Sequence, residues 1–444
     1  MEVKQFYDKA LAHGSYAIKS GPQIALVDPE RDPQKYYDYT AEHNAKIVAI
    51  IETHPHADFV SSHLEIAKKT GATIYTSRLT QADYPHQPFD DGDEIILDRV
   101  KLKAINTPGH SPDSISILLI DEKGNEHSIF TGDTLFVGDV GRPDLRETAG
   151  ALTAKREELA GQMYDTIHKK LWKLHDETLV YPAHGPGSLC GKAMGSDLYS
   201  TVGKEKKTNY ALQPMPKDEF VKTLLHEQPF IPKYFGFDVS VNKTGAANLE
   251  DSISQVARPR DEVTFKEGVL IVDTRSREEF INGHYDKSIN IPDALRFETW
   301  LGSIISPSEK FYLINSDEEA RERMIRKAAK IGYENNVEAA LIAPSNLSHS
   351  SPQINSGEFE ENPDNYFILD VRNESEVKEN KKFENSKNIP LHQLRERVQE
   401  IDTNKPVVVH CAGGYRSGVA ASIVEMIKPG LKVYDLGEAI KSYD

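Results

Sequence analysis

Cysteine is nearly absent from this sequence of 444 residues, which contains only Cys190 and Cys411. Two cysteines so far apart cannot organise a disulfide-stabilised scaffold. The sequence therefore predicts a fold held by hydrophobic cores, in a protein that works in a reducing compartment.

Long apolar runs and excess positive charge are also missing. No stretch reaches the roughly 18 apolar residues that a membrane helix needs, and residues 1–21 lack the apolar core of a secretory signal. Lys and Arg number 53 against 69 Asp and Glu, which gives a net charge of −16. Such a chain repels polyanions on average. We therefore expect a soluble, cytoplasmic protein that binds neither membranes nor nucleic acid.

The first part of the chain alternates strand-like and helical patterns. The strand-like runs lie at residues 24–28, 47–53, 114–120 and 127–133, and residues 58–71 read as a helix that ends at Gly71. Several of these strands end in Asp or His and lead into a loop. This pattern predicts an α+β sandwich with its loops gathered at one edge. Residues 205–256 are richer in Pro, Gly and Asn, and we expect a linker or wrapping segment there.

The remainder of the chain is an internal repeat. Residues 268–292 resemble residues 364–390, and residues 310–316 parallel residues 405–411. Two such copies predict two α/β domains rather than a solenoid, and their near-continuous apolar strands are typical of buried parallel sheets. The predicted domains are residues 1–245, 256–345 and 355–444.

Histidine and aspartate are concentrated in one short stretch, "ETHPHADF" at residues 52–59. It places His54, His56 and Asp58 at alternate positions, which lets them converge. Further candidate ligands each follow a strand and a turn, and these are His110, Asp133 and His184. Buried His and Asp without partners are costly and rare. We therefore expect a metal site, and the order and spacing of its residues resemble the metallo-β-lactamase fold.

One ligand of that fold's usual motif, HxHxDH, is missing, because Phe59 occupies the last position. A second metal would therefore lose a ligand. The remaining pattern indicates one metal held by His54, His110 and Asp133. Two His and one carboxylate are typical of non-haem Fe(II) oxygenases, where O₂ and an anionic substrate find open positions. We expect one Fe(II) per chain, with the other His and Asp residues of the cluster orienting ligands or substrate.

The stretches "THPHADFVSSHLEIA", "TPGHSPDSIS", "FTGDTLFVGDVGRPDL" and "YPAHGPGSLCGK" resemble the persulfide dioxygenase family. Phe after the Asp is similar to the branch that is fused to two rhodanese units. The resemblance implies an αββα metallo-β-lactamase sandwich followed by two α/β rhodanese-like domains. It also implies oxidation of a low-molecular-weight persulfide, RSSH, to sulfite. The family's iron ligands carry over onto His54, His110 and Asp133, while "GPGSLCGK" departs from the glutathione-specific members and leaves R open.

Arg142 and Cys190 have two readings each. Arg142 either meets an anionic substrate or is an exposed structural residue on a turn. Cys190, six residues after His184, either lines the substrate pocket or is a small buried hydrophobe.

"VVVHCAGGYRSGVAASIVEMI" predicts a strand, a short loop and a helix, with Cys411 at the strand end. The loop C-x-x-x-x-R-S looks like the active-site loop of a rhodanese. Its backbone N–H groups can form an anion nest at the helix N-terminus, which favours a thiolate or a persulfide on the cysteine. We expect Cys411, Arg416 and Ser417 to be catalytic. The persulfide loop between them is Ala412, Gly413, Gly414 and Tyr415.

The first copy of the repeat lacks this chemistry. Ser316 takes the place of the cysteine, and Asp317, Glu318 and Glu319 follow it. These carboxylates would repel a sulfur anion. We expect residues 256–345 to be an inactive rhodanese homology domain, and the Asp–x–Arg pairs of both copies to be salt bridges that stabilise the fold.

The whole pattern predicts a persulfide dioxygenase with sulfurtransferase activity. Its partners would be a thiol persulfide, O₂ and sulfite, with thiosulfate as product, and we expect a homo-oligomer. Two alternatives remain: a zinc-dependent thioester hydrolase of the glyoxalase II type, and a sulfur-carrier or sensing module.

Overall fold

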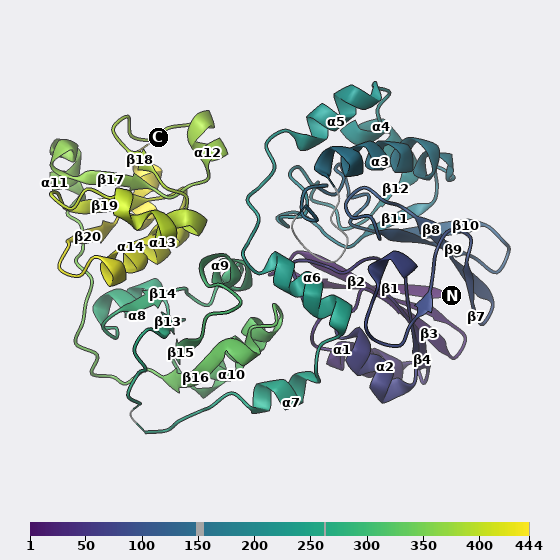
Figure 1. The fold of residues 1–444 in the computed structure, drawn as a ribbon, viewed down its shortest axis with the longest axis horizontal. Helices are drawn as coiled ribbons and strands as arrows, with labels where there is room; N and C mark the ends of the chain where they lie inside the picture. Colours follow the sequence, from purple (N-terminus) through teal and green to yellow (C-terminus); the bar gives the residue numbers. More distant parts are fainter. Residues whose placement is uncertain (148–154, 262, 444) are drawn as a thin grey trace. The chain divides into compact units, whose positions relative to one another are not determined.

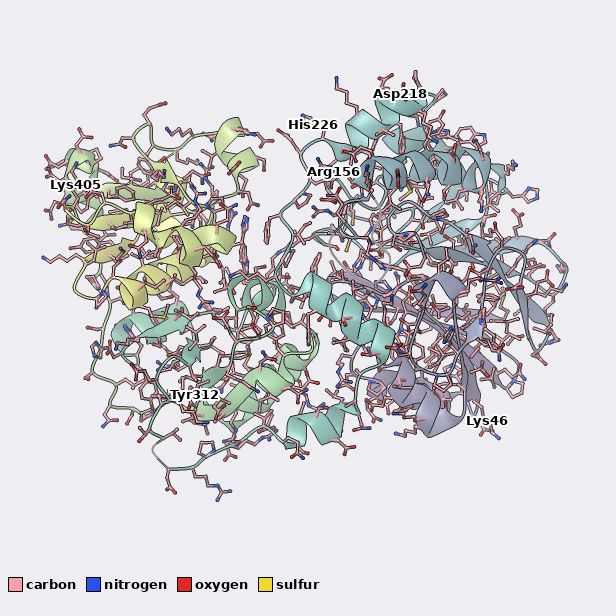
Figure 2. The ribbon with its side chains drawn as sticks, in the orientation of Figure 1. Lys46, Arg156, Asp218, His226, Tyr312 and Lys405 are labelled. Carbon is pink, nitrogen blue, oxygen red and sulfur yellow. The ribbon has the colours of Figure 1, made fainter. Side chains whose placement is uncertain are left out.

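A computed structural model describes residues 1–147, 155–261 and 263–443 of the chain. The chain divides into two compact units. The first comprises Met1–Ser252 together with Ala329–Gly332, and the second comprises Ile253–Ala328 together with Tyr333–Asp444. Charged side chains such as Lys46 and Asp218 project outward from the ribbon (Figure 2).

The first unit contains two six-stranded sheets. One sheet has the order β1 (Glu2–Asp8), β2 (His13–Ser20), β3 (Gln23–Val27), β4 (Lys46–Ile51), β5 (Thr73–Thr76) and β6 (Gln87–Pro88). The other has the order β12 (Ser200–Thr201), β11 (Leu179–Pro182), β10 (Glu126–Gly132), β9 (Ile115–Ile120), β8 (Val100–Asn106) and β7 (Glu94–Leu97).

Strand β3 shows why both faces of the first sheet are covered. Ala25 and Val27 belong to the core that also holds residues of the second sheet, such as Leu102 and Phe130. The alternate residue Leu26 packs instead with the helices on the outer face. Because side chains alternate along a strand, a strand buried on both faces needs a continuous apolar run, and β3 has one in "IALV".

Helices cover the outer faces, so the first unit is an αββα sandwich, as the sequence predicted (Figure 1). Helices α1 (Gln34–Glu42) and α2 (His63–Thr70) pack on the first sheet. Helices α3 (Arg156–Lys169), α4 (Val202–Thr208) and α5 (Lys217–Leu225) pack on the second. Helix α2 ends at Thr70, with Gly71 at φ 76° as its C-cap, as expected from the sequence, but it begins at His63 instead of residue 58.

Of the two alternatives for residues 205–256, a linker or a wrapping segment, the linker is wrong, because most of this segment is helical. It contains the end of α4 and all of α5, followed by α6 (Phe235–Thr244) and α7 (Leu249–Ser254). Phe220 and Phe235 are buried. Pro and Gly mark the helix ends here: Pro216 precedes α5, and Gly245, with φ 85°, follows α6.

The second unit contains two four-stranded parallel sheets with corresponding strand orders, as the repeat predicted. The first is β14 (Ser288–Asn290), β13 (Leu270–Asp273), β15 (Phe311–Asn315) and β16 (Val337–Ile342). The second is β18 (Lys387–Asn388), β17 (Phe367–Asp370), β19 (Val407–His410) and β20 (Val433–Asp435). The helices are α8 (Arg277–Asn282), α9 (Phe297–Ile304), α10 (Glu318–Ala329), α11 (Ser356–Glu361), α12 (Glu374–Glu379), α13 (Leu394–Arg397) and α14 (Tyr415–Ile427).

Both copies carry the predicted salt bridge. It lies at the carboxyl end of β13 in the first copy and of β17 in the second. Arg275 donates to both oxygens of Asp273, and Arg372 does the same to Asp370, with shortest distances of 2.6 Å. Among the described residues, no helix is both long enough and apolar enough to span a membrane.

Candidate metal centre and cysteine loop

The loop after β4 carries the first candidate ligands, and Asp28 fixes where it begins. Asp28 follows β3 and accepts hydrogen bonds from the backbone N and the Oγ1 of Thr53, at 2.7 and 2.8 Å. The carboxyl ends of the adjacent parallel strands β3 and β4 lie side by side, which brings Asp28 next to the loop. Asp28 therefore holds the backbone directly before His54 in place.

His54, His110 and Asp133 meet at one point, although they follow three different strands. One ligand atom from each lies within 4.8 Å of the other two. The Nε2 atoms of His54 and His110 are 3.8 and 3.5 Å from Oδ2 of Asp133. All three side chains are buried. The structure thus brings together the residues that the sequence assigned to one metal.

Each of the two imidazoles is held by its other nitrogen. Nδ1 of His54 lies 3.0 Å from Oγ1 of Thr53, and Nδ1 of His110 lies 2.8 Å from the carbonyl oxygen of Arg142. Such outer contacts orient a metal-binding imidazole and fix which nitrogen faces the metal. Here they leave Nε2 of both rings facing Asp133.

The atoms that face this point need a further partner. Nε2 of His54 and both oxygens of Asp133 are buried and have no hydrogen-bond partner among the described residues. Burial lowers the pKa of His54 and of His110, which keeps both rings neutral. Burial alone would raise the pKa of Asp133, but nearby imidazoles, first among them that of His184, bring it below its usual value. Neutral imidazoles beside a carboxylate fit a bound divalent metal ion.

The remaining members of the motif lie around the same point. Nε2 of His184 is 3.4 Å from Oδ2 of Asp58 and 3.5 Å from Oδ1 of Asp133, and these two carboxylates raise the pKa of His184 to about 10 against the effect of burial. Nε2 of His56 is 3.4 Å from Oδ1 of Asp28. His56, Asp133 and His184 also have ligand atoms within 4.8 Å of one another.

Phe59 fills the position of the missing ligand. Its side chain is fully buried, and its ring centroid lies 3.9 Å from that of His13 and 4.5 Å from that of His56. His13, at the start of β2, was not singled out from the sequence. Both of its ring nitrogens lack a hydrogen-bond partner within the described part of the chain. Phe59 therefore presents an aromatic ring, without a ligand atom, at the motif position whose histidine would bind a second metal.

Arg142 is not exposed, so the exposed-turn alternative is wrong. Its guanidinium is buried and donates two hydrogen bonds of 2.7 Å to the carboxylate of Asp144. It also donates to the carbonyl oxygens of Leu189 and Phe230, at 3.2 and 3.4 Å. These contacts hold the turn whose carbonyl orients His110.

Cys190 is buried beside the metal point. Asp58, His184 and Cys190 have ligand atoms within 4.8 Å of one another. Burial and the nearby carboxylates of Asp58 and Asp133 raise the pKa of the Cys190 thiol well above its usual value. The thiol is therefore protonated and a poor nucleophile in this environment.

Helix α6 braces the metal loop through Asn242, which the sequence did not reveal. The side-chain amide of Asn242 donates to the carbonyl oxygens of His56 and Phe59, at 2.9 and 2.7 Å. Its oxygen accepts from the backbone N of Ser61 at 2.8 Å. One buried side chain thus satisfies three backbone groups of an otherwise irregular loop.

Cys411 directly follows β19 and is buried, as its sequence position predicted. The backbone N of Gly414 donates to its Sγ at 3.1 Å, and Oγ of Ser417 lies 3.6 Å from the same atom. Gly414 has φ 101°, and a Cβ there would lie 3.1 Å from the backbone N of Glu438. Ala412 is exposed, so the loop opens to solvent on that side.

The two side chains that frame the loop have partners. Arg416 forms a two-bond ion pair with Glu376, at 2.6 and 2.7 Å. Oγ of Ser417 donates to the carbonyl oxygen of Gly414 at 3.0 Å. The hydroxyl of Tyr415 donates to the carbonyl oxygen of Pro292, at 3.4 Å. These contacts position the loop at the start of α14.

The corresponding place in the first copy is acidic. Ser316 is exposed, and its Oγ donates to Oδ2 of Asp317 at 3.2 Å. Oδ1 of Asp317 caps the next helix by accepting from the backbone N of Ala320 at 2.8 Å. Glu318 and Glu319 are exposed. The turn is therefore a capped helix start instead of a cysteine loop.

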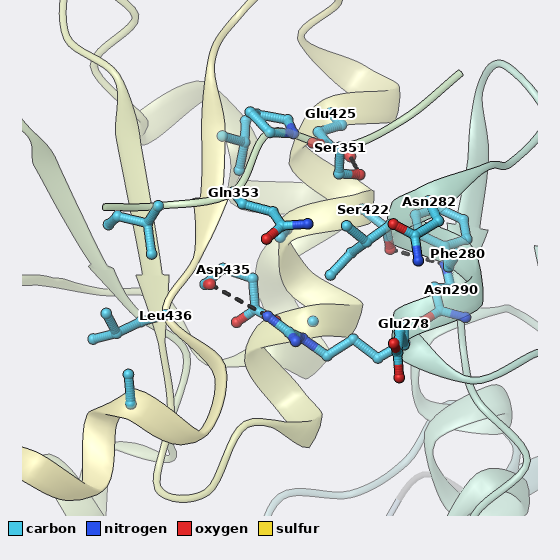
Figure 3. Close-up of a pocket in the computed structure, with 18 residues that line it drawn as sticks. Glu278, Phe280, Asn282, Asn290, Ser351, Gln353, Ser422, Glu425, Asp435 and Leu436 are labelled. Atoms are coloured by element: carbon cyan, nitrogen blue, oxygen red, sulfur yellow. Dashed lines mark hydrogen bonds and ion pairs between the residues drawn. The ribbon is translucent and has the colours of Figure 1, made fainter. Parts of the chain in front are cut away.

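A pocket of about 410 Å³ lies within the second unit, between α8 and α14 (Figure 3). Arg277 of α8 pairs with Asp435 on one side, and Glu425 accepts a hydrogen bond of 2.9 Å from Ser351 on the other. Burial raises the pKa of Glu425 to about 7. Small residues of α14, such as Gly418, leave the space.

Comparison with known proteins extends these observations. A family model described as the metallo-beta-lactamase superfamily matches residues 11–184, and a model described as a rhodanese-like domain matches residues 355–443. The persulfide dioxygenase ETHE1, mitochondrial, of Bos taurus is 29% identical over 247 residues, which are 54% of this chain and 87% of that protein. The cytoplasmic hydroxyacylglutathione hydrolase of Arabidopsis thaliana is 30% identical over 174 residues, which are 38% of this chain and 62% of that protein.

A solved structure is similar over more of the chain than these two relatives. A metallo-beta-lactamase from Staphylococcus aureus is 31% identical, with a TM-score of 0.68, and the match covers 77% of this chain and 98% of that one. The match therefore extends beyond the αββα sandwich. With the metal-binding cluster in the first unit, it shows that the chain belongs to the metallo-β-lactamase superfamily, with persulfide dioxygenases among its homologues and a rhodanese-like domain over residues 355–443.

Proposed function

We propose that this protein is a persulfide dioxygenase and sulfurtransferase that forms thiosulfate. In the first reaction, one persulfide RSSH, one O₂ and one water give one thiol RSH, one sulfite and two protons. The terminal sulfur is oxidised and O₂ is reduced. In the second, a sulfane sulfur carried by Cys411 is transferred to sulfite.

The observation that carries the proposal is the ligand set of the metal point. His54, His110 and Asp133 converge, and Nε2 of His54 and both oxygens of Asp133 are buried without a hydrogen-bond partner among the described residues. Phe59, which is buried, takes the position of the last histidine of the HxHxDH motif. Fe(II) bound at the metal point would supply the redox chemistry of O₂ activation, which two-His-one-carboxylate sites support. Burial of all three side chains keeps bulk water from this point.

The surrounding residues serve this reaction by position and charge. The contacts of Thr53 and of the Arg142 carbonyl hold the two imidazoles in place. The apolar wall of Phe59 favours one metal and gives a sulfur atom a non-polar neighbour. His184 lies between two carboxylates, which keep it protonated, so it can supply a proton to the thiolate that leaves as RSH.

Cys411 performs the second reaction. Its thiolate attacks the terminal sulfur of a second persulfide, so an S–S bond forms on the enzyme and the thiol RSH leaves. Sulfite then attacks that outer sulfur, thiosulfate leaves and the thiolate is restored. The Gly414 amide lies at hydrogen-bond distance from Sγ and stabilises its negative charge.

The first copy of the repeat is proposed to be an inactive rhodanese-like domain. Its sheet has the same order as that of the second copy, but Ser316 and the carboxylates that follow it cannot carry sulfur. Tyr415 of the active loop donates to the Pro292 carbonyl of this copy. The first copy can therefore support the Cys411 loop of the second copy.

Metal analysis and O₂ uptake on anaerobically purified protein test the proposal. We expect about one iron per chain, O₂ uptake that depends on a persulfide, and thiosulfate as the final product when persulfide is in excess. Removal of the metal with a chelator should stop O₂ uptake, and Fe(II) should restore it.

The competing function is zinc-dependent thioester hydrolysis. It has support in the hydroxyacylglutathione hydrolase relative and in the second group of possible ligands, His56, Asp133 and His184. Protein with two zinc ions per chain that hydrolyses S-lactoyl thioesters, and takes up no O₂ with persulfides, would overturn the proposed dioxygenase.

A further inference from the structure

Arg146 is a buried cation with unused hydrogen-bond donors. Its side chain is 2% exposed, and its Nη2 donates to Oδ2 of Asp113 at 3.2 Å. Nε and Nη1 are buried and have no hydrogen-bond partner among the described residues. Arg142 provides the contrast, because carbonyl and carboxylate oxygens occupy its donors.

Lys243 is a second buried cation in the same region. Its side chain is 7% exposed, and its Nζ has no hydrogen-bond partner in the described part of the chain. It follows Asn242, the residue of α6 that braces the metal loop. Burial lowers the pKa of Lys243, and the charge of Arg146 lowers it further, so the two cations are neighbours.

Both cations belong to segments that hold the loops of the metal centre. Arg146 donates to Oδ2 of Asp113, and Oδ1 of Asp113 accepts from Oγ of Ser111 at 2.6 Å, next to His110 in the chain. Lys243 directly follows Asn242, whose amide donates to the carbonyl oxygens of His56 and Phe59. A molecule at the metal point could extend to Arg146.

The charges of this region do not balance. Asp113 is buried, and its oxygens accept hydrogen bonds from Ser111 and Arg146. The other carboxylate whose charge reaches Lys243 belongs to Asp83, which is exposed. Among the described residues, the two buried cations thus share the buried carboxylate of Asp113, and three buried nitrogen atoms, Nε and Nη1 of Arg146 and Nζ of Lys243, have no hydrogen-bond partner. Unpaired buried charge is strongly destabilising, which indicates an anionic ligand.

We propose that Arg146 and Lys243 bind an anionic group, a carboxylate or a phosphate, on the thiol portion R of the persulfide. This inference rests on the proposed function, and it names the class of substrate. The terminal sulfur would lie at the metal point while the anion of R occupies the donors of the two cations. Thiols whose R is neutral would leave these donors unpaired and bind more weakly.

Matched pairs of substrates test the proposal. The persulfides of 3-mercaptopropionate and 3-mercaptopropan-1-ol differ in a carboxylate, and those of 4′-phosphopantetheine and pantetheine differ in a phosphate. We expect kcat/KM for O₂ uptake to be at least about 10-fold higher for the anionic member of one pair, since a charge-assisted hydrogen bond is worth that much. The pair that shows the difference identifies the anion.

Lys243→Met tests whether Lys243 binds the anion. The substitution removes the charge and, among the described residues, leaves no hydrogen-bond partner of Nζ unpaired. The preference for the anionic member should fall by about 10-fold or more. Lys68→Met, an exposed lysine of α2, is the matched control and should keep the preference. The double variant Arg146→Gln/Asp113→Asn, which removes the ion pair as a whole, should lose it as well.

Equilibrium binding separates this inference from the proposed function. Calorimetric titration of the metal-loaded protein with the four free thiols needs no turnover. If no persulfide supports O₂ uptake but the anionic thiol still binds at least about 10-fold more tightly, and Lys243→Met removes the difference, the proposed dioxygenase fails and the anion site stands. Equal binding of both members of each pair by wild type, or an unchanged preference in Lys243→Met, overturns the anion site.

Discussion

At the scale of single residues, the metal point depends on which atoms are left without partners. The Nδ1 atoms of His54 and His110 have polar partners in the chain, whereas Nε2 of His54 and the oxygens of Asp133 have no hydrogen-bond partner among the described residues. Phe59 removes a ligand and also packs against His13 and His56. Phe59 thus offers no ligand atom for a second metal and fills the space with an apolar ring.

Ser316→Cys should not create a second sulfurtransferase centre. In a Ser316→Cys, Cys411→Ser double variant, the new thiol would stand next to Asp317 and close to exposed glutamates. These carboxylates raise a thiol's pKa and repel sulfite. Thiosulfate formation from persulfide and added sulfite should therefore stay below about 1% of the wild-type rate. Colorimetric assay of thiosulfate measures this, with Cys411→Ser alone as the control. A rate well above that of the control would show that the electrostatic argument is wrong.

The metal point could be predicted from the sequence because its residues follow strands in short motifs. The three candidate ligands converge as expected, and Cys411 lies at a strand end. Asn242, Arg146 and His13 could not be recognised from the sequence, because each contacts residues that are far away in the sequence. A lone Asn or Arg has no spacing that signals such a contact; only the folded chain reveals it.

At the scale of elements, α6 matters more than its sequence suggested. The segment around it was expected to be a linker or a wrapping segment because of its Pro, Gly and Asn residues. Those residues instead mark the ends of short helices. One of these helices, α6, places Asn242 against the metal loop. Propensity alone could not show this, because tertiary packing decides such short helices.

Asn242→Ala should weaken both the fold and metal binding. Three backbone groups of the metal loop would lose their partner, at a cost of about 3 kcal/mol in the free energy of unfolding. Because the loop orients His56 and lies next to His54, iron affinity should fall roughly 10-fold. Calorimetric melting and competition with a chelator measure the two effects. Asn125→Ala, an exposed residue that bonds to Asp121, should change neither, and iron affinity equal to wild type in Asn242→Ala would contradict the brace.

Glu425 on α14 should make the stability of the second unit depend on pH. Its pKa is raised to about 7 in the folded protein against about 4.3 when unfolded. The folded state therefore binds this proton more tightly, and the stabilisation present below pH 4.3 is lost as pH rises through 7. Glu425→Gln removes the titration, so its Tm should rise relative to wild type between pH 5 and pH 8, by the equivalent of about 1–2 kcal/mol after allowance for partial exposure.

Melting of the full chain at both pH values measures the effect. Glu438→Gln, whose carboxylate is 80% exposed, is the matched control and should leave the pH dependence unchanged. A Glu425→Gln variant with the same pH dependence as wild type would mean that Glu425 is ionised at its ordinary pKa in the fold.

At the scale of the whole molecule, the two proposed centres belong to different units. The candidate iron ligands lie in the first unit and Cys411 in the second. They share no residue. Under the proposed function, sulfite made by the first centre would be consumed by the second, and a common chain would raise its effective concentration near Cys411.

Cys411→Ser should separate the two activities. Serine is nearly isosteric, so the Gly414 contact and the loop should survive. Its hydroxyl is not ionised near neutral pH and cannot form a persulfide, so no sulfur is carried. The initial rate of O₂ uptake should stay within about twofold of wild type, because no metal ligand is touched. The product should change from thiosulfate to sulfite, as measured by ion chromatography.

His110→Ala should give the converse result. Loss of one of three ligands should abolish O₂ uptake, and iron bound per chain should fall, because two remaining ligands hold the metal poorly. The Cys411 loop lies in the other unit and keeps its Gly414 and Ser417 neighbours. This variant should therefore still form thiosulfate from persulfide and added sulfite at close to the wild-type rate. If Cys411→Ser instead stops O₂ uptake while iron content is unchanged, the persulfide reaches the metal through Cys411. The two centres would then act in series on one sulfur atom, with Cys411 as the entry point.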